Sequence, residues 1–222
     1  MFTAIAFIAL FATVKAGGWS SKFSTDDAAK TQGEAHREYD HNDQFNKENA
    51  QGFTPLAMAI KDHNVGEVGR LLDNGADPNK RSQNITPVVG AIMQSFIGVD
   101  KTVQEKIVRK LLTAGADANA SSDGTPLIHA IKIGNVGLVR ALLEHHAEAG
   151  KQPGGIPLNL AIGGGHLDMV PALIEAGADP EERDETYLKG NKVNAYDLAE
   201  GRGYNLKEVV TKHAPMTKVQ SK

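Results

Sequence analysis

The chain has 222 residues, 41% of them hydrophobic and 23% charged, which is ordinary for a globular protein and excludes a fully disordered chain. Its formal net charge of -3 argues against a nucleic-acid partner, because such binding requires clustered Lys and Arg. The sequence contains no Cys. Disulfides, thiolate metal sites and a Cys nucleophile are therefore excluded together.

An uncharged apolar run, Phe2–Val14, opens the chain. Val14 and Ala16 stand where a signal peptidase reads small residues before Gly17, so residues 1–16 are predicted to be a cleaved signal peptide. No Lys or Arg precedes the run, which leaves two alternatives: a retained membrane anchor, or a misassigned start in front of an ordinary apolar helix. An anchor is disfavoured because 13 residues reach only about 20 Å across a hydrocarbon core of about 30 Å.

The segment at residues 17–50 is polar and holds too little apolar surface to fold independently. It is predicted to be a polar tether or a loose N-terminal cap. His36 and His41 lie there among acidic residues, but no helix holds them at ligand spacing, so a metal site is disfavoured.

One pattern recurs four times after this segment. Each copy has Pro at a first helical position, apolar residues at helical spacing, a break, and a second apolar helix. The unit is a helical hairpin. The copies run from Thr54 to Asn79, Thr86 to Asn119, Gly124 to Ala149 and Ile156 to Pro180.

The copies TPLAMAI, TPVVGAI and TPLIHAI, together with GADPN and GADAN, resemble the ankyrin repeat. A fifth, eroded copy covers Asn194 to Val210, as expected of a terminal repeat with a polar outer face. The resemblance implies an all-α ankyrin-repeat solenoid of helix-turn-helix units joined by β-turn fingers, over residues 51–212. Residues 213–222 are predicted to be a C-terminal tail.

The His of the family motif is absent from all four copies. The residues in its place are Ala57, Val89, Ile128 and Asn159. We therefore expect the usual hydrogen bond between neighbouring turns to be missing. His146 stands where Gly would take a left-handed conformation.

Two irregularities interrupt the repeats. In the second copy the interval from Thr86 to Gly115 is 29 residues, eight more than in its neighbours, and the extra material lies at Gln94–Gln104. This insert either presents an apolar tip, with Phe96 and Ile97, to a partner, or extends the first helix and folds back. The link at Asp179–Val193 is predicted to be a solvated loop.

The resemblance also implies where a partner binds, because ankyrin proteins use the fingers and the exposed face of each first helix. The alternative for Phe53 and Ile85 is packing between neighbouring turns. The candidate residues are Phe53, Lys61, Asp62, Gln83, Ile85, Met93, Gln94 and Lys132, with Gly163 and Gly164 in the fourth copy and Phe96 and Ile97 from the insert.

Catalytic and cofactor motifs are not found, so the chain is predicted not to be an enzyme and to need no cofactor. Gly163–His166 resembles a phosphate loop but lacks the Lys and Ser or Thr that would follow. A metal site at His145, His146 and Glu148 lacks a fourth ligand. Sequons at Asn84 and Asn119 are explained by the repeat pattern.

The sequence thus predicts a non-catalytic scaffold, periplasmic or secreted, that binds another protein. Small exported bacterial ankyrin proteins that it resembles protect the cell by binding toxic or oxidative-stress enzymes, which gives a narrower hypothesis. One alternative is a membrane-anchored adaptor that retains residues 2–19. Another is an enzyme or small-ligand protein that uses the turn at His145–Glu148.

Overall fold

The computed structural model of the chain describes residues 43–94, 100–120, 124–188 and 191–213. The predicted signal peptide, the tether up to residue 42, Phe96, Ile97 and the tail from residue 214 lie outside them. Within the described ranges, no helix is long and apolar enough to cross a membrane.

A Thr-Pro or Ile-Pro pair starts the first helix of each of the four repeats. Pro fixes a helical φ at a position where its missing N–H is not needed. The Oγ1 atom of Thr54 also accepts a hydrogen bond from Ala57 N at 3.1 Å, and that of Thr125 accepts one from Ile128 N at 3.4 Å. The helices are α4 (Pro55–Lys61), α6 (Pro87–Met93), α8 (Pro126–Lys132) and α10 (Pro157–Gly164).

Asn residues cap the second helices of the first and third repeats. Asn64 begins α5 (Val65–Asp73) and Asn135 begins α9 (Val136–Glu144), each accepting a backbone N–H three residues on. In the fourth repeat, a 3₁₀ turn, η2 (Leu167–Met169), precedes α11 (Val170–Glu175). Pro171 lies in the first turn of α11, where a proline does not interrupt the hydrogen bonds of the helix.

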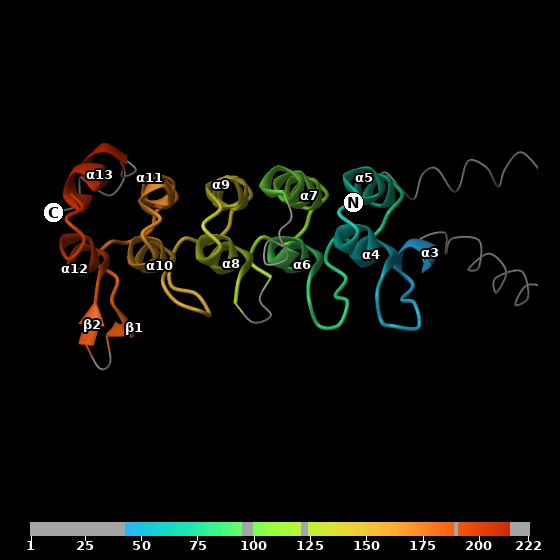
Figure 1. Ribbon diagram of the computed structural model, residues 1–222, viewed down its shortest axis with the longest axis horizontal. Coiled ribbons are helices and arrows are strands. Elements are labelled where there is room, and N and C mark those ends of the chain that lie inside the picture. Colours follow the sequence, from blue (N-terminus) through green and yellow to red (C-terminus); the bar gives the residue numbers. More distant parts are fainter. Residues whose placement is uncertain (1–42, 95–99, 121–123, 189–190, 214–222) are drawn as a thin grey trace, which may run out of the picture. The chain divides into compact units, whose positions relative to one another are not determined.

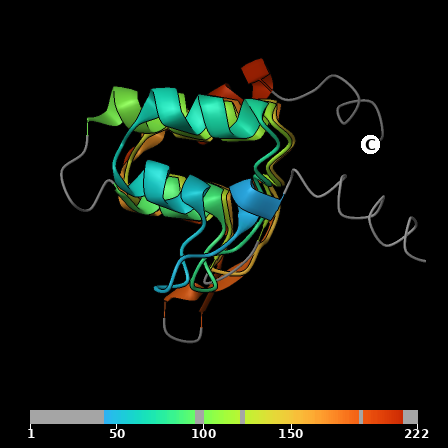
Figure 2. The same cartoon turned by 90° about the vertical axis from the view of Figure 1, so that its right-hand side faces the viewer.

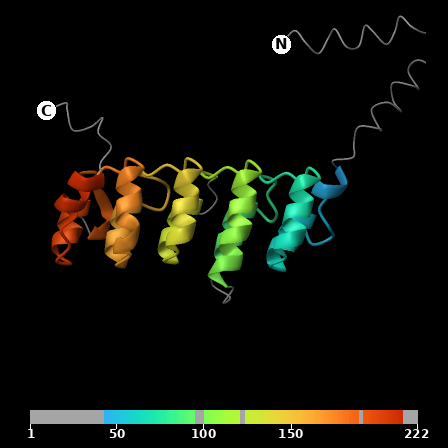
Figure 3. The same ribbon diagram turned by 90° about the horizontal axis from the view of Figure 1, so that it is seen from above.

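The helices form two rows, with α4, α6, α8, α10 and α12 in one and α5, α7, α9, α11 and α13 in the other (Figure 1). Figure 3 shows the row of second helices from above. The fingers project from the row of first helices, as the end-on view in Figure 2 shows. One valine of each of four second helices is fully buried between the rows. These are Val68, Val108, Val139 and Val170. The predicted solenoid of helix-turn-helix units is confirmed.

The second repeat departs from one expectation. Helix α6 has 7 residues, as α4 and α8 have, so the predicted alternative of a longer first helix is wrong. The second helix is extended instead. Helix α7 (Lys101–Thr113) has 13 residues, compared with 9 in α5 and in α9.

Gln104 keeps this longer repeat in register. In the first and third repeats, the backbone N–H of the turn residue Asn64 or Asn135 donates to the carbonyl of an Ala in the preceding helix. In the second repeat, Gln104 stands at that place with 1% of its surface exposed. Its Nε2 donates to the carbonyls of Ala91 and Ile92, at 3.1 and 2.6 Å. The side chain of Gln104 therefore donates the hydrogen bond that a backbone N–H of the turn donates in the first and third repeats.

An asparagine ladder links the ends of neighbouring repeats on the other side. Asn46, Asn79 and Asn119 each donate from Nδ2 to the carbonyl of a left-handed residue in the next repeat and accept the N–H two residues further on. Asn46 belongs to α3 (Asp43–Asn46), so this part of the segment that was predicted to be a tether or a cap is hydrogen-bonded to the first repeat. The corresponding residue of the third repeat is Gly150, which has no side chain.

The link after the fourth repeat contains two paired strands, so the predicted plain loop is wrong. Strands β1 (Asp184–Leu188) and β2 (Asn191–Val193) form an antiparallel hairpin that projects on the same side as the fingers (Figure 1). The eroded fifth copy then forms α12 (Ala195–Glu200) and α13 (Leu206–His213). A reciprocal capping box of Asn194 and Asp197 starts α12.

Candidate protein-binding site

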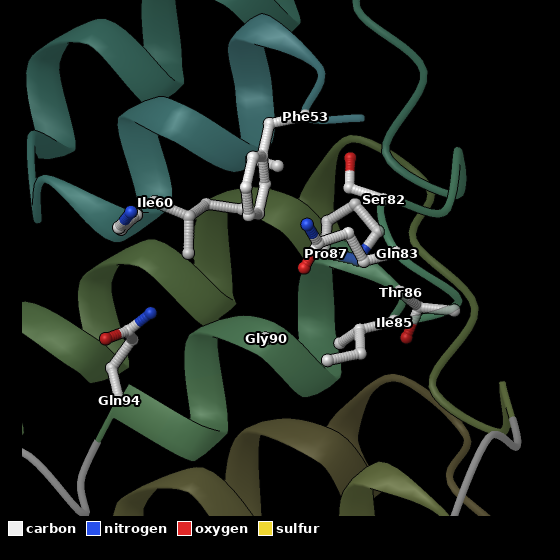
Figure 4. Close-up of a pocket in the computed structure, with 11 residues that line it drawn as sticks. Phe53, Ile60, Ser82, Gln83, Ile85, Thr86, Pro87, Gly90 and Gln94 are labelled. Atoms are coloured by element: carbon white, nitrogen blue, oxygen red, sulfur yellow. The ribbon is translucent and has the colours of Figure 1, made fainter. Parts of the chain in front are cut away.

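A small hollow lies between the first two repeats, where two fingers meet α4 and α6. Its volume is about 130 Å³. Figure 4 shows the side chains of Phe53, Ile85, Pro87 and Gln94 around it. The lining is mostly apolar and consists of Phe53, Ala57, Ile60, Lys61, Ser82, Gln83, Ile85, Thr86, Pro87, Gly90 and Gln94.

Both fingers are tight turns that the local sequence stabilises. In the first, Oδ1 of Asn49 accepts hydrogen bonds from the backbone N–H groups of Gln51 and Phe53, at 2.9 and 3.1 Å. In the second, Gln83 and Asn84 have φ values of 50° and 65°, the pattern of a two-residue type I′ turn. The first finger thereby presents Phe53, and the second presents Ile85.

Hydrogen bonds join the two fingers, which corrects the expectation that such bonds are missing. Ser82 Oγ accepts from Thr54 N at 3.1 Å and donates to Thr54 Oγ1 at 3.2 Å. The third and fourth repeats use the same positions, where the Thr125 hydroxyl donates to the side chain of Gln152. Ser and Gln at the finger base thus take over the role that the sequence assigned only to the missing His.

Gly90 creates the hollow, and it is the residue that the sequence analysis missed. A methyl group built on its Cα would meet only Cγ2 of Ile85, at 3.7 Å, which is an ordinary contact. The same position of the other first helices holds Met58, His129 and Leu160. The signal was present in the alignment of the copies: one Gly stands in a helix where its counterparts are large.

Exposed side chains surround the hollow on the row of first helices. Ile85 is 38% exposed and Met93 is 40% exposed, the only large apolar side chains of the described residues at that level. The Lys61 ammonium lies 5.4 Å from the centre of the Phe53 ring, a cation-π distance. Lys61, Met93 and Lys132 occupy one position in three successive helices, and all three are exposed.

The structure brings five of the predicted contact residues together around the hollow: Phe53, Lys61, Gln83, Ile85 and Gln94. Phe53 is half-buried, while Ile85 is exposed, so only Phe53 fits the alternative of packing between turns. Three others, Asp62, Met93 and Lys132, are exposed at the ends of first helices. Gly163 and Gly164 end α10, and Gly165 follows in a left-handed conformation as its C-cap.

Clear pKa shifts occur on the other row of helices. The hydrogen bonds that Arg109 donates to the carboxylates of Glu144 and Glu105 raise the pKa of Arg109, which lies 2.8 Å from Glu144 on α9. The hydrogen bond from Arg70 lowers the pKa of Glu67 one turn earlier on α5. These ion pairs stabilise helices and join repeats.

The paired helices and the projecting fingers define a helical-repeat scaffold. Family models bear on its identity. One for ankyrin repeats, in three copies, matches residues 97–184, and one for a single ankyrin repeat matches residues 51–83. Together they cover more than half of the chain, which therefore belongs to the ankyrin-repeat family, and the predicted fold class is confirmed. No curated protein matches the chain significantly.

Proposed function

We propose that this chain binds another protein through the surface around the hollow, formed by the first two fingers and the exposed ends of α4 and α6, and that it performs no chemistry of its own. Ankyrin repeats generally mediate binding to other proteins. The observation that carries the proposal is the convergence of Phe53 and Ile85, from two different fingers, on one apolar hollow. Buried apolar pockets rimmed by polar groups are where binding energy concentrates in protein interfaces.

Binding is tested by affinity capture with the full-length chain, followed by mass spectrometry of the captured proteins. The double variant Phe53→Ala, Met93→Ala is compared with a control, Thr113→Ala, Arg140→Ala, whose changes are exposed on the second row. We expect the double variant to lose a partner that the control retains. A partner that both variants retain would contradict this location, and a chain that captures nothing would contradict protein binding.

The proposal extends to where the protein acts. The apolar run at Phe2–Val14 supports export to the periplasm or the exterior, where a partner would be a toxic or stress-related enzyme. The alternative is a membrane-tethered adaptor with residues 2–19 retained. The N-terminal residue of the mature protein decides: Gly17 supports export, and Met1 or Phe2 supports the tether.

A further inference from the structure

The size of the hollow limits what it can receive. Its volume of about 130 Å³ is close to that of an apolar cavity, about 150 Å³, known to bind benzene. One side chain of leucine or phenylalanine size therefore fills it. Gly90 leaves this space in the second repeat alone of the four, since Met58, His129 and Leu160 stand at the same position elsewhere.

The charged residues beside the hollow indicate which residues of the partner would flank that side chain. Lys61 is the only charged residue among those that line it. Lys132, at the same position two helices further along, is a second exposed cation, with Met93 between the two. Two exposed acids lie nearby: Asp62, the C-cap residue of α4, and Glu48, whose carboxylate lies at the first finger on the side of Gln83.

The spacing of the row indicates the length of the matching segment. Packed helices lie about 8–10 Å apart, so Lys61 and Lys132 are separated by roughly 16–20 Å. An extended chain rises about 3.3 Å per residue and covers this distance in about five or six residues. Successive side chains of an extended chain point to opposite sides, so acidic residues six positions apart would face both lysines, with the apolar residue at an even position between them.

We infer that the partner contributes an extended acidic segment, with one leucine- or phenylalanine-sized side chain in the hollow and acidic residues facing Lys61 and Lys132. This inference rests on the proposed function and adds the chemistry of the partner. Met93 then contacts the apolar part of the segment, and Asp62 weakens the attraction.

The test uses a library of random nine-residue peptides, selected on the full-length chain. We expect the enriched peptides to carry one Leu, Phe or Met flanked by Asp or Glu about six residues apart. Synthetic copies of the enriched peptides are then measured by fluorescence anisotropy. Raising the salt from about 50 to 200 mM should weaken their binding.

Variants of the chain assign the contacts. Gly90→Leu should reduce affinity by roughly tenfold or more, because its side chain occupies the hollow. Gly90→Ala should reduce affinity less than Gly90→Leu does. It should also raise the melting temperature, because Ala is a better helix former than Gly. Lys61→Ala and Lys132→Ala should each weaken binding roughly threefold to tenfold, and Asp62→Asn should strengthen it. The control Lys106→Ala, on the other row, should change nothing.

Each result bears on one of the two proposals. Basic or uncharged peptides, peptides that bind Gly90→Leu as well as the unaltered chain, or no enrichment at all would overturn the acidic segment. The proposed function survives these results if a captured protein still requires Phe53 and Met93. If no captured protein requires them, the proposed function fails as well.

Discussion

At the scale of single residues, His146 occupies a conformation that favours glycine. Its φ is 65°, in the left-handed region that the sequence indicated for this position. Replacing it with Gly should stabilise the fold by about 0.5–1 kcal/mol, measured by urea unfolding. The control is His145→Gly, which should destabilise because His145 has a φ of -101°. Equal effects of the two variants would contradict this explanation.

Gln104 is a residue whose role depends on both its burial and its amide. Replacing it with Met keeps the length of the side chain but leaves the carbonyls of Ala91 and Ile92 without this donor. Each such loss costs about 1–3 kcal/mol, so we expect unfolding in urea to require clearly less denaturant. Lys106→Met, on the exposed side of α7, serves as the control and should have little effect.

The residues that sequence analysis placed well are those with local roles. The Pro at the start of each first helix acts within its own helix turn, and a local pattern is sufficient to find it. Gln104 and Gly90 act through neighbours distant in the sequence. Their roles follow from packing, which sets whether a Gln finds carbonyls or a Gly opens a hollow.

At the scale of elements, α7 begins with a charged cap. The backbone N–H and hydroxyl of Thr102 donate to the Asp100 carboxylate and lower its pKa. Because the pKa in the folded state is below the unfolded value of about 3.9, the stabilisation is complete above that value and is lost as the pH falls. The advantage of the native chain over Asp100→Asn, measured as melting temperature, should therefore shrink between neutral pH and about pH 3.

Thr102→Val provides the control for this cap, since it removes one of the two donors and should reduce the pH-dependent difference. A difference between the native chain and Asp100→Asn that stays constant with pH would show that the charge of Asp100 does not contribute.

The asparagine ladder can be continued by one step. Gly150 stands at the ladder position of the third repeat, and a Cβ built there meets no atom within 4 Å. Asn at this position should bond the fourth repeat as Asn119 bonds the third, adding about 0.5–1.5 kcal/mol to the free energy of unfolding. Gly150→Ala measures the backbone effect alone, so the comparison of Asn with Ala isolates the ladder. An equal gain in both variants would mean that no new bond forms.

The elements themselves were predictable where the repeat is regular. The hairpin at Asp184–Val193 was not, because the link departs from the repeat pattern that located the other elements. The length of α7 was missed for the same reason, since the insert gave no second copy for comparison.

At the scale of the whole molecule, each repeat contacts only its neighbours, so the last one protects the interior. Helices α12 and α13 cover α10 and α11, and Arg202 donates to the carbonyl of Gly163. A chain that ends at Arg183 should unfold at lower urea concentration and with a smaller dependence on urea, because it buries less surface. The control is a chain that ends at His213. Equal unfolding of the two would show that the fifth copy does not stabilise the stack.

The amide of Gln104 has a consequence for the history of the chain. In the first and third repeats, a backbone N–H of the turn between the helices donates the hydrogen bond to the first helix, so the number of residues in that turn is fixed. In the second repeat a side chain supplies that bond, and the number of residues between Gln94 and Asp100 is free to change. We therefore expect a foreign peptide inserted between Gln94 and Asp100 to leave the repeats on either side in register.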